Sequence, residues 1–166
     1  MDKNQQKDMM QAGDIAPDLL GKDQNDKEIR RSDFPGKSIA LYFYPKDNTS
    51  GCTAEACSLR DGIADLKKAG YEVIGVSKDS AKSHRGFIEK YELPFTLIAD
   101  TEKELHELFG VWVEKSMYGR KYMGTERSTF LIDPEGKITA VLKGKEVKTK
   151  DHANQLLTLI EKNNQI

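Results

Sequence analysis

Two cysteines, Cys52 and Cys57, are the residues of this chain best suited to covalent chemistry. They lie five positions apart within residues 44–61, YPKDNTSGCTAEACSLRD. The pattern places Cys52 in the first turn of a helix that follows a buried strand. Backbone N–H groups and the positive end of the helix dipole favour a thiolate at such a position. Because the thiolate is the reactive form of cysteine, Cys52 is the candidate nucleophile.

Three residues just before Cys52 have types that suit a thiolate site. Thr49 could donate a hydroxyl hydrogen bond to the sulfur, and Pro45 offers a rigid apolar wall that would limit access of water. Gly51 lets the backbone approach closely. A simpler interpretation stays open, in which Cys52 is an inert buried residue, Thr49 a cap residue and Pro45 a strand terminator.

The spacing of the two cysteines predicts a conformational change if they pair. Residues five apart in a regular helix have Cα atoms roughly 8–9 Å apart. A disulfide tolerates about 7 Å at most. The first turn or two would therefore have to unwind before Cys52 and Cys57 could form a disulfide. Alternatively, Cys57 is simply a small core residue of the helix.

The elements that must position these residues alternate along the chain. Short apolar runs predict strands, and apolar residues at spacings of three and four predict helices. We expect strands at 38–44, 71–77, 95–99, 129–133 and 137–142, and helices at 52–69, 80–91, 151–161 and after a capping pair of Thr101 and Glu104. This order predicts an α/β fold with a central mixed sheet flanked by helices, which is the outline of a thioredoxin-like fold. Periodicity alone does not exclude a flavodoxin-like one.

Length and composition restrict the class of protein. The chain has 166 residues, with 26 basic against 27 acidic side chains and no basic stripe, so binding to nucleic acid is not expected. No apolar run is long enough to span a membrane, and the polar start is unlike a signal peptide. We expect a cytoplasmic protein with a flexible tail at 1–12 and a single domain at 13–166.

The histidines and the remaining aromatic residues predict no cofactor. Each histidine lies singly on a predicted helix, where we expect a surface or internally hydrogen-bonded residue rather than a metal ligand: His84, His106 and His152. Trp112, Tyr118 and Tyr122 are interpreted as packing residues. Because no zinc pattern, phosphate loop or dinucleotide-binding glycine pattern is present, neither a metal nor another cofactor is expected.

Residues 44–61 resemble the peroxiredoxins, and within them the bacterioferritin-comigratory-protein or PrxQ subfamily. The family motif of Pro, Thr and the attacking Cys matches Pro45, Thr49 and Cys52, and the subfamily pattern GCTxEAC matches residues 51–57. Residues 111–133 also resemble the subfamily. Two positions depart from it, because Ser50 stands where Pro is common and Thr125 where an apolar residue is common.

The resemblance implies a thiol peroxidase that reduces hydroperoxides. It makes Cys52 the peroxidatic and Cys57 the resolving cysteine of an intramolecular disulfide, with Thr49 and Arg127 beside the reacting atoms. Arg127 would stabilise the thiolate and orient the peroxide. The resemblance further implies recycling by thioredoxin or another dithiol, and a monomer.

Two other functions remain open at this point. A thioredoxin-like disulfide oxidoreductase normally carries Cys-x-x-Cys, whereas here four residues separate the cysteines. A redox sensor would form the same disulfide without repeated turnover. Turnover therefore separates a sensor from an enzyme.

Overall fold

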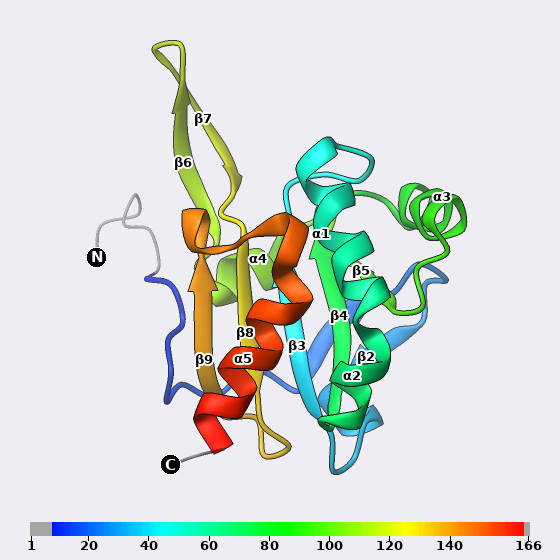
Figure 1. The fold of residues 1–166 in the computed structure, drawn as a ribbon. Helices are drawn as coiled ribbons and strands as arrows, with labels where there is room; N and C mark the ends of the chain where they lie inside the picture. Colours follow the sequence, from blue (N-terminus) through cyan, green and yellow to red (C-terminus); the bar gives the residue numbers. More distant parts are fainter. Residues whose placement is uncertain (1–7, 165–166) are drawn as a thin grey trace.

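The computed structural model describes residues 8–164 and is built around one mixed sheet (Figure 1). In this part of the chain the sheet order is β5-β4-β3-β8-β9. Strands β3, β4 and β5 are parallel, and β8 and β9 form an antiparallel hairpin at the other edge. The bounds are β3 Ser38–Phe43, β4 Tyr71–Ser77, β5 Thr96–Ala99, β8 Ser128–Ile132 and β9 Ile138–Lys143. The predicted central mixed sheet is confirmed.

Strand β3 is central because both of its faces are apolar. Ala40 and Tyr42 point into the hydrophobic core on one side of the sheet. Leu41 and Phe43 point into a second core on the opposite side. Side chains alternate across a strand, so a continuous apolar run is suited to a strand buried between two layers. The segment that carries both cysteines follows directly after this strand.

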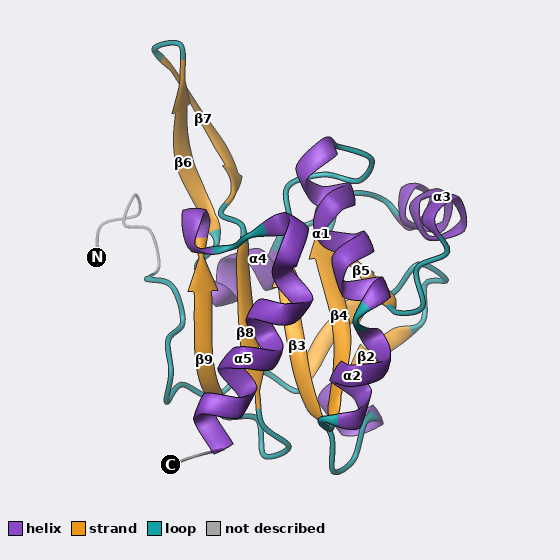
Figure 2. Cartoon of the chain, in the orientation of Figure 1, coloured by secondary structure: helices purple, strands orange, loops and turns teal. Residues whose placement is uncertain are grey.

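Helices cover both faces of the sheet (Figure 2). Helices α1 (Ser50–Asp61), α2 (Ile63–Lys68) and α5 (His152–Asn164) lie over one face, and α4 (Glu104–Phe109) lies over the other. Helix α3 (Ala81–Tyr91) contributes Phe87 to the same core as α1. Within residues 8–164, three short 3₁₀ helices complete the set, at Arg31–Asp33, Gly144–Glu146 and Thr149–Asp151.

The predicted single helix at 52–69 is wrong, because the structure divides it into α1 and α2 at Gly62. A Cβ atom at Gly62 would lie 2.5 Å from the Cβ of Ala153 in α5. The close approach of α5 therefore requires glycine at this point. Gly70, which follows the C-cap of α2, adopts a φ of +89°, a left-handed conformation that glycine adopts without strain.

The predicted capping pair of Thr101 and Glu104 is also wrong. The N-cap position of α4 is Lys103, whose side chain makes no capping bond. The Asp100 carboxylate instead accepts the backbone N–H groups of Leu105 and His106, at 3.1 and 2.8 Å. The buried acidic side chain from the end of β5 thus replaces the expected cap.

Two antiparallel pairs of strands were not predicted. Strands β1 (Leu19–Lys22) and β2 (Glu28–Arg30) pair with each other, and so do β6 (Trp112–Met117) and β7 (Arg120–Thr125). The second pair projects beyond the body of the molecule (Figure 1). Tyr118 at its turn is 99% exposed and Tyr122 is 44% exposed, so their interpretation as packing residues is wrong.

The predicted N-terminal tail lies partly outside the described residues, since residues 1–7 are not among them. Within the described part, Met9 and Met10 pack against the core, and the Met10 N–H donates to the Phe109 carbonyl at 3.0 Å. Contacts with the domain thus begin before residue 12, where we expected the tail to end. Among residues 8–164, none of the helices has the length and apolar character needed to cross a membrane.

Candidate active site

Cys52 lies in the first turn of α1 and is buried, with 1% of its surface exposed. The first helical hydrogen bond runs from the Thr53 N–H to the Thr49 carbonyl at 2.8 Å. The amides of residues 50–52 precede that bond and lie at the positive end of the helix. The sequence pattern placed Cys52 in this setting, which favours a negative sulfur.

Arg127 connects the sulfur with a buried acid. It lies in the short link between β7 and β8, far from the cysteine in sequence. One guanidinium nitrogen, Nη2, donates to the Cys52 Sγ at 3.4 Å, and the other, Nη1, donates to the Glu55 Oε1 at 2.6 Å. The two nitrogens of the planar guanidinium thus bind Cys52 and Glu55 at the same time.

The charge of Arg127 is strengthened by its surroundings. Burial opposes the charge, yet the negative charges of Glu55 and Cys52 outweigh it and raise the pKa of Arg127. Gly51 allows the guanidinium to come this close, because a Cβ atom there would lie 3.2 Å from Nη2. The site therefore holds a permanent cation against the sulfur.

Glu55 is the site residue that sequence reasoning missed. It is fully buried, one turn after Cys52 on the same face of α1. Burial raises the pKa of Glu55 to about 7, although the Arg127 charge and hydrogen bond act in the opposite direction. Its position within the GCTxEAC pattern was visible, but the sequence gives no sign that Arg127 would reach it.

Thr49 does not direct its hydroxyl proton at the sulfur. The hydroxyl donates to the Lys46 carbonyl at 2.9 Å and fixes the turn before α1. Its oxygen keeps a lone pair that can accept a hydrogen bond from a bound ligand. Pro45 is half-buried at the start of this turn, and its carbonyl accepts the Lys78 ammonium at 3.3 Å.

The turn before Cys52 is held in place by Asp47, whose part was also not predicted. The Asp47 carboxylate binds the Tyr44 hydroxyl at 2.6 Å, the Ser83 hydroxyl at 2.8 Å and the His84 Nδ1 at 2.7 Å. Its backbone N–H donates to the Asp79 carboxylate at 2.8 Å. These bonds tie residues 45–49 to α3 and to the end of β4.

The same carboxylates and His84 are the one group in the described residues with metal-ligand spacing. Ligand atoms of Asp47, Asp79 and His84 lie within 4.8 Å of one another. These groups are engaged by hydrogen bonds within the protein, and His84 Nε2 also lies 2.9 Å from the Ile98 carbonyl. We therefore interpret the group as a structural support.

All three histidines are buried and hydrogen-bonded. His106 lies between Asp100 and Thr125, at 2.6 and 3.0 Å, and His152 lies between Thr129 and Gln155, at 2.7 and 3.0 Å. We expected each histidine to be either exposed at the surface or hydrogen-bonded internally, and the second alternative is correct for all three. Trp112 packs edge-on against His106, with ring centroids 5.9 Å apart.

Cys57 lies on the same helix as Cys52 and is half-buried. Both thiols are free. Since both cysteines are in the regular helix α1, their separation is the helical one expected from the sequence. The pair cannot form a disulfide while this part of α1 is helical.

This arrangement can stabilise an anionic sulfur and a charge that moves away from it. A helix N-terminus and a guanidinium converge on Cys52, while Glu55 fixes the guanidinium. Such preorganised donors stabilise charge that develops on an oxygen as a bond to sulfur forms. The second thiol, five residues away, is suited to capture an oxidised sulfur.

Sequence comparison places the chain in a known family. Residues 12–141 match the AhpC/TSA family. The chain is 45% identical over 152 residues to "Peroxiredoxin Bcp" of Bacillus subtilis strain 168, which covers 92% of this chain and 96% of that protein.

Solved structures agree with the sequence comparison. A cysteine-to-serine mutant of PrxQ from Xylella fastidiosa superposes with a TM-score of 0.85 and 33% identity, covering 95% of this chain and 99% of that one. A Xanthomonas campestris bacterioferritin comigratory protein gives a TM-score of 0.78 and 35% identity, covering 87% and 89%. That structure is a trapped intermediate/ligand complex, and it bears on the alkyl peroxide reduction activity of the Xanthomonas protein. The similarity confirms the expected thioredoxin-like fold.

Proposed function

This chain is a peroxiredoxin of the AhpC/TSA family and resembles the Bcp and PrxQ enzymes, and from that premise we propose that Cys52 reduces hydrogen peroxide and organic hydroperoxides. Peroxide reduction is the activity common to the family. The observation that supports Cys52 as the attacking residue is the 3.4 Å contact between its sulfur and the Arg127 Nη2. Alkyl hydroperoxides are included because of the activity named for the Xanthomonas protein.

In the first step the Cys52 thiolate attacks the terminal oxygen of the hydroperoxide. A sulfur–oxygen bond forms, the oxygen–oxygen bond breaks, and Cys52 becomes a sulfenic acid. The second oxygen leaves as hydroxide or alkoxide and takes a proton from the solvent to become water or an alcohol. Arg127 and the helix N-terminus stabilise the charge that moves from sulfur to this oxygen, while Thr49 accepts a hydrogen bond from the peroxide.

In the second step Cys57 attacks the oxidised sulfur of Cys52. A disulfide forms, and the hydroxyl group of the sulfenic acid leaves as water. Because both residues belong to α1, this step requires the first turns of the helix to unwind. The bonds of Arg127 to Cys52 and Glu55 are among the contacts that must yield.

A dithiol protein then reduces the disulfide by thiol exchange. We propose thioredoxin as this partner and a monomer as the working form, on the basis of the subfamily resemblance and the intramolecular pair of cysteines. The alternatives are a redox sensor and a disulfide oxidoreductase. A cytoplasmic location remains our expectation, based on the low cysteine content.

The test is peroxide consumption coupled to thioredoxin, thioredoxin reductase and NADPH. Wild type should turn over many times, and Cys52→Ser should be inactive. Cys57→Ser should consume about one equivalent of peroxide and then stop, because the sulfenic acid is formed but not resolved. Titration of thiols after one equivalent distinguishes the intramolecular disulfide from a sulfenic acid.

Two results would reject the proposal. Full turnover by Cys52→Ser would show that Cys52 is not the attacking residue. A single cycle by wild type with every dithiol donor supplied would instead favour the redox sensor.

A further inference from the structure

Glu55 has one carboxylate oxygen that its contact with Arg127 leaves unexplained. Oε1 accepts from Arg127, but Oε2 is buried without a hydrogen-bond partner. Its neighbour is the Nε2 of His152, at 3.5 Å. An unsatisfied buried oxygen next to a nucleophile calls for a functional explanation, since such atoms are costly and uncommon.

His152 has a defined tautomer in this setting. The Gln155 Oε1 accepts the backbone N–H of Lys148 at 2.8 Å and faces the His152 Nδ1 at 3.0 Å. Its amide nitrogen is occupied with the Glu146 carbonyl. Because Gln155 thus presents an acceptor, Nδ1 carries the proton and Nε2 presents a lone pair.

One group occupies that lone pair, and a second lies beside it. The Thr129 hydroxyl donates to Nε2 at 2.7 Å, and the Glu55 Oε2 lies on the same side. Burial lowers the pKa of His152, which keeps the ring neutral near neutral pH. A neutral ring whose Nε2 carries no proton gives Oε2 neither a hydrogen-bond donor nor a positive charge, which favours the protonated form of Glu55.

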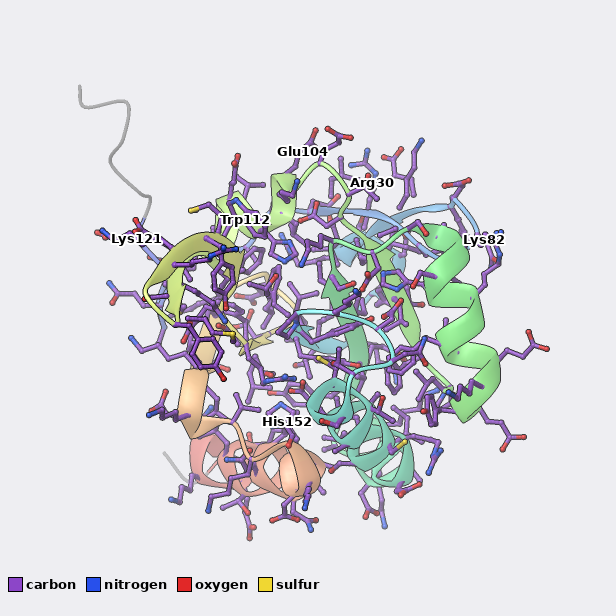
Figure 3. The ribbon with its side chains drawn as sticks, turned by 90° about the horizontal axis from the view of Figure 1, so that it is seen from above. Arg30, Lys82, Glu104, Trp112, Lys121 and His152 are labelled. Atoms are coloured by element: carbon purple, nitrogen blue, oxygen red, sulfur yellow. The ribbon has the colours of Figure 1, made fainter. Side chains whose placement is uncertain are left out.

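We propose that His152 is a positioning residue for Cys52, because it favours the protonated form of Glu55 and so leaves the Arg127 charge available to the sulfur. The inference rests on the proposed role of Cys52 and deepens it. Figure 3 labels His152 where the start of α5 meets α1, and these elements pack together. His152 in α5 thereby acts on Cys52 through the side chains of Glu55 and Arg127.

The charge balance explains how the effect reaches the sulfur. Arg127 faces two groups that can be negative, the Cys52 sulfur and Glu55. When Glu55 is protonated, the guanidinium charge is compensated by the thiolate alone. When Glu55 is ionised, two negative groups share one cation, and the thiolate is less favoured.

The buried Tyr42 hydroxyl belongs to the same environment. It is a second polar atom without a hydrogen-bond partner, and burial, followed by the charges of Glu55 and Cys52, raises the pKa of Tyr42. A neutral phenol adds no charge to the group. Arg127, His152, Tyr42 and Cys52 are therefore the ionisable groups that face Glu55.

The experiment measures alkylation of Cys52 by iodoacetamide in the Cys57→Ser background. Alkylation reports the thiolate and needs no peroxide, so its outcome does not depend on whether the protein turns over. His152→Asn retains an N–H donor for Gln155 but removes the Nε2 edge of the ring, which leaves room for water to donate to Oε2 and stabilise ionised Glu55. Glu55→Gln keeps an acceptor for Arg127 and removes the ionisable group.

We expect His152→Asn to slow alkylation at pH 6 by about 3- to 10-fold, because its Glu55 is ionised there and competes for Arg127. At pH 8.5 the two proteins should react at similar rates, since Glu55 is ionised in both. In the Glu55→Gln background, His152→Asn should change neither rate.

The outcome that overturns the proposal is equally specific. An unchanged rate at pH 6, or the same loss with Glu55→Gln present, would show that His152 only supports the fold. If His152→Asn unfolds, Glu55→Gln still tests the step on which the proposal depends, the competition of Glu55 and Cys52 for Arg127. It should raise the alkylation rate relative to wild type at pH 8.5, and no increase there would reject the proposal.

Discussion

Replacing Arg127 with lysine removes the guanidinium fork while retaining one positive charge. The two nitrogens of Arg127 bind different partners, the Cys52 sulfur at 3.4 Å and the Glu55 carboxylate at 2.6 Å. A single ammonium cannot occupy both positions. Since the carboxylate contact is the shorter one, we expect the ammonium to remain with Glu55 and the sulfur to lose its donor.

The size of the effect follows from the value of one charged hydrogen bond. A hydrogen bond to a charged group contributes about 1.5–3 kcal/mol, and about 1.4 kcal/mol corresponds to a tenfold change in rate. Loss of the contact in the transition state should therefore slow the reaction of Cys52 with peroxide roughly 10- to 100-fold. The charge that remains nearby keeps the loss toward the lower end of this range.

Single-turnover kinetics measure this step without the later ones. The reduced Cys57→Ser protein is mixed with hydrogen peroxide in a quenched-flow instrument, and the remaining peroxide is quantified. Arg30→Lys is the matched control, because Arg30 is an exposed arginine on β2 that pairs with Asp18 and Glu28. If Arg127→Lys reacts within twofold of Arg30→Lys while both remain folded, the role given to the fork is wrong.

Three further predictions concern single residues near or far from the site. Because the pKa of Glu55 is about 7 in the folded protein against 4.5 for the free side chain, the native state binds an extra proton between these values. Stability should therefore fall by about 3 kcal/mol as the pH rises through that window, and urea unfolding of Glu55→Gln should lack this loss. Gly51→Ala should slow peroxide reduction about 3- to 10-fold, measured at saturating thioredoxin, because its Cβ would lie 3.2 Å from the Arg127 Nη2. Tyr118→Ala should change the free energy of unfolding by less than about 0.5 kcal/mol, since Tyr118 is 99% exposed.

The elements that carry long, regular patterns could be predicted from the sequence. Strand β3 was visible as a continuous apolar run, and the hairpin of β8 and β9 as two runs around Pro134-Glu135-Gly136. The break between α1 and α2 was not predicted, and neither was the close approach of Ala153, whose Cβ would lie 2.5 Å from a Cβ at Gly62. The pair β6 and β7 was missed because most of its residues are exposed and lack the alternation of a half-buried strand.

The candidate site also contains some residues that could be predicted from the sequence and others that could not. Cys52 and Cys57 could be identified because their chemistry and their helix are local in sequence. The contact of Arg127 with the sulfur could be expected only from the family resemblance, since no spacing rule joins residues so far apart. Glu55 and Asp47 could not be assigned roles, because their partners, Arg127 and His84, lie far away in the sequence.

The contacts on either side of the two cysteines indicate where α1 can unwind. Ahead of them, Asp47 is tied to α3 and β4 by its carboxylate and its backbone N–H. Behind them, the Ser58 hydroxyl accepts the backbone N–H of Ala153 at 3.1 Å and fixes the rest of α1 to α5. Both cysteines lie between these two attachments.

Oxidation weakens what holds this segment in place. As a sulfenic acid, Cys52 no longer presents a full negative charge to Arg127, so the contact between the guanidinium and residue 52 loses its charge assistance. The bond from Arg127 to Glu55 remains. Under the proposed mechanism, the guanidinium that favours attack by the thiolate would hold Cys52 less strongly once the attack is complete, and we expect the unwinding that Cys57 requires to follow this first step.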